Sequence, residues 1–173
     1  PKGLNYIADQ IHYKTNALGQ ALKSLGYDVV DEPCFDTIKL RIHEDEKNLL
    51  MRMMREQSIN LNYFTEDIVS ISTNESSTLE KLDFLLETFA QFKSKQSFRL
   101  QIKEEYTIPA ELLRTDAILQ EEVFNKYHTE TELMRYIKRL EKKDLSLTHS
   151  MISLGSCTMK LNAATQMLPI SWG

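Results

Sequence analysis

A run near the carboxyl-terminal end of the chain gathers the side chains best suited to chemistry. Gly155 is followed by Ser156, Cys157 and Thr158, and Lys160 stands two residues further on. Glycine lets the backbone adopt conformations closed to other residues, so the amide groups after it can converge on a ligand. The hydroxyls, the thiol and the ammonium group can all donate hydrogen bonds. Judged by its residue types alone, this run is either an anion-binding nest or a turn between a helix and the next element.

Read as a string, residues 151–163 (Met-Ile-Ser-Leu-Gly-Ser-Cys-Thr-Met-Lys-Leu-Asn-Ala) resemble the signature of the glycine cleavage system P-protein family. These proteins are the pyridoxal-phosphate-dependent glycine dehydrogenases (decarboxylating). The likeness continues on both sides of the signature, through residues 124–136, 140–145 and 167–172, with a weaker echo at 35–38. It therefore covers nearly the whole chain. Ser153 is a departure, because the family usually has proline at this position.

The resemblance implies a parent enzyme of two fold-type I halves, in which glycine is decarboxylated on pyridoxal phosphate. The aminomethyl group then passes to the lipoyl arm of H-protein. The implied partners are lipoylated H-protein, the remainder of the P-protein chain and a second copy in a homodimer of the full-length enzyme. The implied location is the cytoplasm of a bacterium or the mitochondrial matrix of a eukaryote.

The family's cofactor lysine lies in a His-Lys-Thr stretch beside a glycine-rich run, downstream of the signature, and this chain has no such stretch. The sequence His12-Tyr13-Lys14-Thr15 is only superficially similar, since no glycines follow it, and we expect an ordinary exposed turn of helix there. We therefore expect no pyridoxal phosphate on this chain alone, and no catalytic residue in it. The resemblance instead implies a loop close to the active site, formed by Gly155, Ser156, Cys157, Thr158, Lys160 and Asn162.

Single residues of this region have simpler interpretations, which we favour. Lys160 has the chemistry of a Schiff-base lysine but is more typical of a loop lysine that faces water or a carboxylate. Cys157 is a redox or nucleophilic thiol only if a nearby cation lowers its pKa, and is otherwise a small packed residue. His149 is the nearest base, and we interpret it as structural.

A second set of polar side chains, His128, Glu130 and Glu132, has some of the character of a metal site. Only His128 and Glu132 would share one side of a helix, and no further ligand joins them. We favour a capping role at the start of a helix. The methionines at 51, 53 and 54 are interpreted as core residues.

Hydrophobic periodicity gives the elements that must position these residues. It predicts a helix over 3–25 ended by Gly26, an extended segment at 27–30, a half-buried strand over 37–42, and a hairpin of 60–64 with 68–72. A second helix begins at 43–45 with a buried stripe of Leu49, Leu50, Met53 and Met54. A third follows the capping box Ser77-x-x-Glu80, with an inner face of Leu82, Leu85, Leu86, Phe89 and Phe92.

This order of elements predicts an α+β fold, a small sandwich of helices over one face of a sheet, in residues 1–95. The resemblance implies that it is like the C-terminal small domain of fold-type I pyridoxal-phosphate enzymes. Residues 96–128 are predicted to be an extended linker with a helical turn near 111–114. Residues 129–173 hold a helix opened by the capping box Thr129-x-x-Glu132, and then the signature loop.

Composition and charge exclude several classes of function. A chain of 173 residues with 42% apolar residues has room for a real core. A net charge of -4 with no basic stripe argues against a nucleic-acid surface, and no apolar run is long enough to cross a membrane. Cys34 and Cys157 are far apart and lack metal-site spacing, so we expect reduced thiols. The start at Pro1 without methionine and the end at Gly173 suggest a piece of a longer polypeptide.

The rival hypothesis is a non-catalytic α+β domain that binds another protein. A His-Lys-Thr stretch with a glycine-rich run further along the gene would support the enzyme, and its absence would support the binding domain. A different fold-type I enzyme is disfavoured, because the signature run is typical of this one family.

Overall fold

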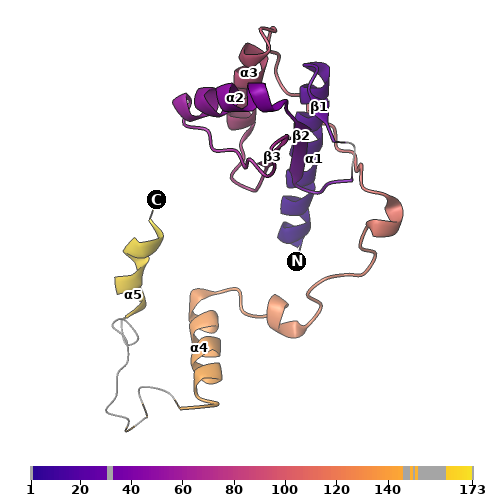
Figure 1. Ribbon diagram of the computed structural model, residues 1–173. Helices are drawn as coiled ribbons and strands as arrows, with labels where there is room; N and C mark the ends of the chain where they lie inside the picture. Colours follow the sequence, from indigo (N-terminus) through magenta and orange to yellow (C-terminus); the bar gives the residue numbers. More distant parts are fainter. Residues whose placement is uncertain (1, 31–32, 146–148, 150, 152–162, 173) are drawn as a thin grey trace. The chain divides into compact units, whose positions relative to one another are not determined.

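The computed structural model describes residues 2–30, 33–145, 149, 151 and 163–172 (Figure 1). The chain divides into two units, Pro1–Asp116 and Ala117–Gly173. Unit 1 carries α1 (Lys2–Ser24), β1 (Asp28–Val29), β2 (Thr37–Arg41), α2 (Glu44–Glu56), β3 (Ile68–Ser72), α3 (Leu79–Phe92) and the 3-10 turn η1 (Ala110–Leu112). Unit 2 carries η2 (Glu122–Asn125), α4 (Glu130–Glu141), α5 (Ala164–Met167) and η3 (Leu168–Ser171). The three-part division at residues 95 and 128 stays a prediction, and residues 96–116 belong to unit 1.

The sheet of unit 1 has three antiparallel strands in the order β1-β2-β3. Ile38 pairs with Ile71, and Leu40 pairs with Val69. Since side chains alternate along a strand, these four buried residues share one face of the sheet. Lys39, on the opposite face, is exposed. The strand predicted over 37–42 is therefore confirmed, with the alternation that the sequence indicated.

The helix predicted over 3–25 is confirmed as α1, and Gly26 ends it. Gly26 has a φ of +82°, and its N–H donates to the carbonyl of Lys23 over 2.9 Å. The N–H of Tyr27 donates to the carbonyl of Leu22 over 3.0 Å. This pair of bonds is a Schellman motif, which needs a left-handed residue and so favours glycine. It turns the chain back so that Tyr27, like Leu22, is buried.

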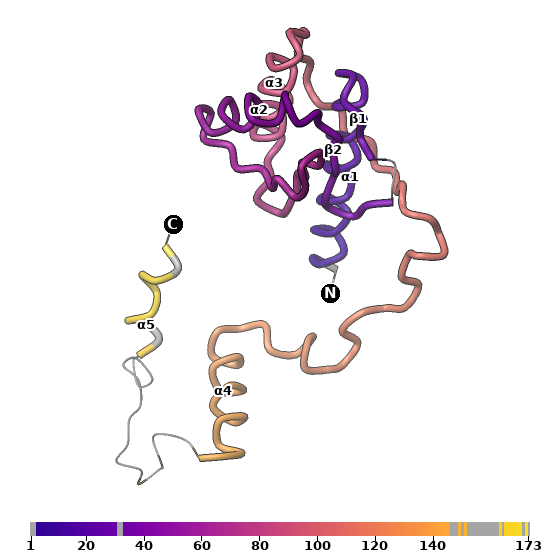
Figure 2. Tube along the Cα trace, in the orientation of Figure 1, coloured from indigo at the N-terminus to yellow at the C-terminus, as the bar shows by residue number. Residues whose placement is uncertain are grey.

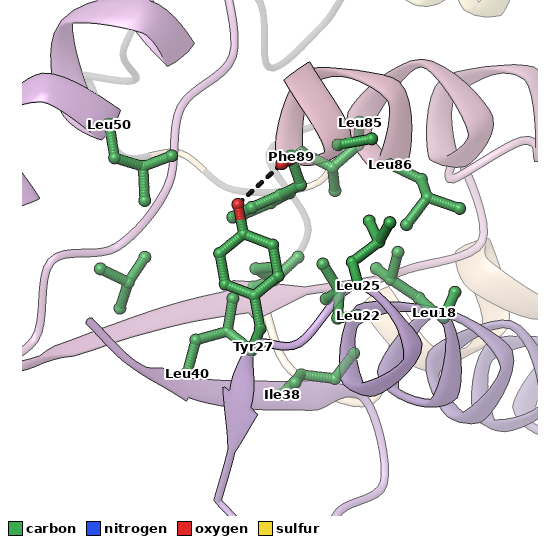
Figure 3. Close-up of a cluster of buried hydrophobic side chains, with 14 of the residues drawn as sticks. Leu18, Leu22, Leu25, Tyr27, Ile38, Leu40, Leu50, Leu85, Leu86 and Phe89 are labelled. Atoms are coloured by element: carbon green, nitrogen blue, oxygen red, sulfur yellow. Dashed lines mark hydrogen bonds between the residues drawn. The ribbon is translucent and has the colours of Figure 1, made fainter. Parts of the chain in front are cut away.

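The core is formed by the buried faces of three helices and the sheet (Figure 3). α1 contributes Leu18, Leu22 and Leu25, α2 contributes Leu50 and Met54, and α3 contributes Leu82, Leu85, Leu86 and Phe89. The Tyr27 hydroxyl donates to the backbone carbonyl of Phe89 over 2.7 Å, and the two rings meet edge to face at 5.1 Å. Burial raises the pKa of Tyr27, so this donor keeps its proton at physiological pH.

Both inner helices differ in detail from their sequence predictions. Leu49 is 52% exposed, because α2 buries only the narrow i, i+4 pair Leu50 and Met54. The predicted capping box that begins at Ser77 is wrong. Thr78 is the N-cap of α3, and its hydroxyl accepts a hydrogen bond from the N–H of Lys81 over 3.3 Å. Ser77 instead stays in the preceding turn, where its hydroxyl donates to Asn74 over 3.2 Å.

The predicted hairpin is only partly present. β3 is a full strand, but its partner arm at 60–64 is reduced to a bridge between Asn62 and Ser70. Those two residues exchange backbone hydrogen bonds of 2.8 and 3.2 Å. The main ladder of β3 is formed with β2 instead, since β2 supplies the apolar residues opposite Val69 and Ile71.

After α3, residues 96–109 form a part of unit 1 without helix or strand. We call this segment the strap. Figure 2 shows it passing beside α1 before the short turn η1, which confirms the helical turn predicted near 111–114 to within two residues. No helix in the described part of the chain is long and apolar enough to cross a membrane.

Replacing Tyr27 by Phe tests the buried hydrogen bond to Phe89. The change removes the donor and leaves a buried carbonyl, so we expect the free energy of unfolding to fall by about 1 kcal/mol. Tyr63→Phe is the matched control, because the Tyr63 hydroxyl is buried and has no hydrogen-bond partner among the described residues. The control should cost less than about half as much. Urea denaturation followed by circular dichroism measures both, and equal losses would contradict the assignment.

Candidate functional site

The loop predicted to lie near the active site is outside the described residues. This applies to all six of its members: Gly155, Ser156, Cys157, Thr158, Lys160 and Asn162. Their roles, including the preferred interpretations of Lys160 and Cys157, stay predictions. His149 is described and is exposed, and its structural role is likewise untested.

The helix before this loop begins as the sequence predicted. The Thr129 hydroxyl accepts a hydrogen bond from the N–H of Glu132 over 3.2 Å, and the Glu132 carboxylate accepts from the N–H of Thr129 over 3.3 Å. The bonds from the Thr129 side chain and backbone lower the pKa of Glu132. The capping box is confirmed, and it fixes the start of α4.

Two of the three residues considered for a metal site, His128 and Glu132, serve local structure. The Nε2 atom of His128 lies 2.9 Å from the carbonyl oxygen of Asn125, and Glu132 is occupied by the cap. Within the described ranges, no three His, Cys, Asp or Glu side chains are grouped as metal ligands.

The apolar side of α4 is exposed. Leu133, Met134, Ile137 and Leu140 each have more than 40% of their surface accessible. Beside them, the rings of Tyr127 and Tyr136 stack at 4.3 Å, with the Arg139 guanidinium over both. No described residue of unit 2 is buried, so its described residues contain no core of their own.

In unit 1, a cavity of about 470 Å³ lies between α1 and the segment from β1 to β2. Its described lining combines polar side chains with a few apolar ones: His12, Thr15, Asn16, Gly19, Gln20, Lys23, Val29, Val30, Pro33, Cys34, Thr37, Ile38, Lys39 and Thr107. A cavity of this size and mixed lining is typical of a small-molecule site.

His12 is the residue that sequence reasoning missed. The prediction of an exposed turn at 12–15 is wrong, because His12 and Thr15 are each only 1% exposed. The two lie on the buried side of α1, in line with Leu18 and Leu22. A prediction of the buried side of α1 from apolar residues alone misses the polar residues that continue this side toward the amino terminus.

The hydrogen bonds of His12 fix its protonation. Its Nε2 accepts from the backbone N–H of Thr107 over 3.1 Å, which requires a bare nitrogen. The proton of the neutral ring then lies on Nδ1, which donates to the carbonyl of Phe35 over 3.1 Å. With both nitrogens engaged, His12 cannot act as a general base toward a molecule in the cavity.

Cys34 is half-buried at the edge of the same cavity. Burial raises the pKa of its thiol, and the charge of Asp36 raises it further, against a smaller opposing effect of Lys23. A thiol with a raised pKa is protonated at neutral pH and is a poor nucleophile. The described cavity therefore has no activated nucleophile and no available base.

The cavity also lacks the groups that pyridoxal phosphate needs. That cofactor is held by a lysine amine, by backbone N–H groups around its phosphate, and by a carboxylate at its ring nitrogen. The described lining includes Lys23 and Lys39 but no carboxylate, and its α1 residues lie far from the start of the helix. The described lining of this cavity does not fit the cofactor.

Comparison with known proteins gives a consistent family. The family described as Glycine cleavage system P-protein matches residues 1–89. "Glycine dehydrogenase (decarboxylating)" of Christiangramia forsetii is 45% identical over 100% of this chain. The proteins of the same name from Flavobacterium johnsoniae and Shewanella loihica are 41% and 42% identical over 99% of it. The chain spans 18% of the length of each of these relatives.

The reactivity of Cys34 tests the electrostatics of the cavity. Asp36→Asn removes a charge that helps to raise the pKa of Cys34, so more thiolate is present at pH 7.5. We expect alkylation of Cys34 by iodoacetamide to accelerate by about twofold, read by site-resolved mass spectrometry. Asp67→Asn is the control, because Asp67 is not among the groups that shift the pKa of Cys34. An unchanged or slower rate in Asp36→Asn would show that this charge does not act on the thiol.

Proposed function

The chain belongs to the glycine cleavage system P-protein family, and from that membership we propose that it is a segment of a pyridoxal-phosphate-dependent glycine decarboxylase. The parent enzyme decarboxylates glycine and transfers the aminomethyl group to the lipoyl arm of H-protein. The observation that carries the proposal is that the likeness to glycine dehydrogenases runs through the entire chain, signature included.

Within that enzyme, unit 1 is the small domain that closes the first fold-type I half. Its support is the mixed architecture, with three helices and a three-stranded antiparallel sheet around one core. The described cavity of unit 1 does not fit the cofactor, so we assign the cofactor to another part of the parent enzyme.

The signature loop has the closer relation to chemistry. Gly155, Ser156, Cys157, Thr158, Lys160 and Asn162 form part of the wall of the active site and supply hydrogen bonds and shape. The lysine that holds pyridoxal phosphate lies outside this chain, in the second half of the parent. The partners of the parent are lipoylated H-protein and a second copy of the enzyme. Its bacterial relatives support a cytoplasmic location.

Radiolabelled glycine tests whether this chain alone lacks the activity proposed for the parent enzyme. The 173-residue chain, given pyridoxal phosphate, lipoylated H-protein and carboxyl-labelled glycine, should release no labelled carbon dioxide. After borohydride reduction, its intact mass should show no covalent cofactor. The full-length parent should show both. A reduced cofactor on Lys160 of the chain would overturn the assignment.

A substitution in the parent separates the role of Lys160 from that of the cofactor lysine. Lys160→Arg keeps the positive charge but cannot form a Schiff base, so the parent should retain its cofactor absorbance. Ser156→Ala, on the same loop, should also retain the cofactor while kcat falls by about tenfold or more, because a hydrogen-bond donor near the reacting groups is lost. Loss of the absorbance in Lys160→Arg would contradict the proposed role.

A further inference from the structure

The strap, residues 96–109, is held against the helices of unit 1 by hydrogen bonds, by the Arg99–Asp83 ion pair at 3.9 Å and by packing of Leu100 on the core. Among the described residues, two of its backbone amides donate to side chains of the helices. Leu100 donates to the Asp83 carboxylate over 2.8 Å, and Thr107 donates to Nε2 of His12 over 3.1 Å. The Tyr106 hydroxyl adds a hydrogen bond to Asp9. The end of the strap at 106–107 thus depends on α1 for its position.

His12 is the centre of this attachment. Its ring lies between Phe35, at 6.0 Å and nearly parallel, and Tyr106, at 5.1 Å and 17°. The same ring bonds to Phe35 through Nδ1 and to Thr107 through Nε2. One buried imidazole therefore joins three segments that are far apart in sequence: α1, the loop before β2, and the strap.

This arrangement holds only while the imidazole is neutral. A second proton would occupy Nε2, the atom that accepts from the N–H of Thr107. Two N–H groups would then face each other at a ring that is only 1% exposed. The Thr107 hydroxyl, 3.3 Å from Nε2, can accept in place of the amide but leaves that amide without its partner. Attachment of the strap and uptake of a proton compete for the same nitrogen.

Other titratable groups lie on the elements around His12, and none of them takes its place in this competition for a proton. α1 brings Asp9 and Tyr13, the strap brings Glu104 and Tyr106, and the loop before β2 brings Cys34 and Asp36. The hydrogen bond to Asp9 raises the pKa of Tyr106 to about 12, and burial raises that of Tyr13, so both phenols stay neutral. The pKa of Cys34 is raised as well.

We propose that His12 is a pH-sensitive clasp, which holds the strap against α1 when neutral and releases its end at Tyr106 and Thr107 when protonated. The sign follows from linkage. The released state binds more protons than the attached state, so attachment is favoured as the pH rises and is lost as the pH falls.

Release of the strap changes the cavity described above. Both His12 and Thr107 line it, and Thr107 is the residue that the strap contributes to the described lining. Acid therefore opens the cavity at Thr107, and the core formed by α1, the sheet and α3 stays closed, because neither His12 nor Thr107 belongs to that core. The device is local and does not depend on the chemistry assigned to the parent enzyme.

Amide hydrogen exchange, resolved by NMR and corrected for intrinsic rates, tests the clasp at pH 7.5 and 5.5. In the native chain, protection of the Thr107 amide should fall by at least about fivefold at the lower pH, since one hydrogen bond is lost. The Leu100 amide, bound to Asp83, should change by less than about twofold. In His12→Gln the difference at Thr107 should disappear, and in His43→Gln, an exposed histidine of the same unit, it should persist.

Unchanged protection of Thr107 in the native chain would overturn the proposal, as would a loss that survives in His12→Gln. If His12→Gln does not fold, the native chain decides by itself. The ring proton resonances of His12 and the amide shift of Thr107 should then titrate with one midpoint, and separate midpoints would refute the clasp.

Discussion

The fold depends on one shared burial, the packing of α1 against the sheet on one side and α3 on the other. Leu18 and Leu22 of α1, Leu40 of β2, and Phe89 of α3 are all fully buried in the same cluster. None of these elements has enough apolar surface to be stable alone. The Schellman turn at Gly26 allows this arrangement, because it leads the chain from the end of α1 directly into β1.

Where the sequence carries a regular apolar pattern, the structure follows it. The helix over 3–25 and the strand over 37–42 were predictable because each buries a single face with the period of its own geometry. Predictions were wrong where two neighbouring residues satisfied the same rule. Ser77 and Thr78 are both good caps, and in the structure Thr78 takes the position. Leu49 fits a helical stripe, but α2 meets the core along a line too narrow to bury it.

The buried polar residues were the least predictable part of the candidate site. His12 is buried because the rings of Tyr106 and Phe35 cover its own ring. Both of these residues are far from His12 in sequence. No periodic pattern indicates that a strap returns over α1 at residue 107. The signature at 155–162 is the opposite case: its sequence identifies the family, yet its side chains lie outside the described residues. The family and the main helices and strands could therefore be predicted from local sequence, whereas the clasp and the cavity depend on tertiary contacts.

These features divide the described residues into a part with a core and a part without one. Unit 1 holds every buried residue that the structure describes, whereas α4 exposes its apolar stripe. A segment of a much longer enzyme is expected to behave in this way, since its second part would be completed by residues from elsewhere in the polypeptide.

Hydrogen exchange of the helix amides in the intact chain tests that division most directly. The account predicts that amides in the middle of α1 and α3 exchange only through global unfolding, with matching free energies, while those of α4 exchange at least about a hundredfold faster through local opening. Equal protection of α3 and α4 would contradict it, because α4 would then belong to a core of the same strength.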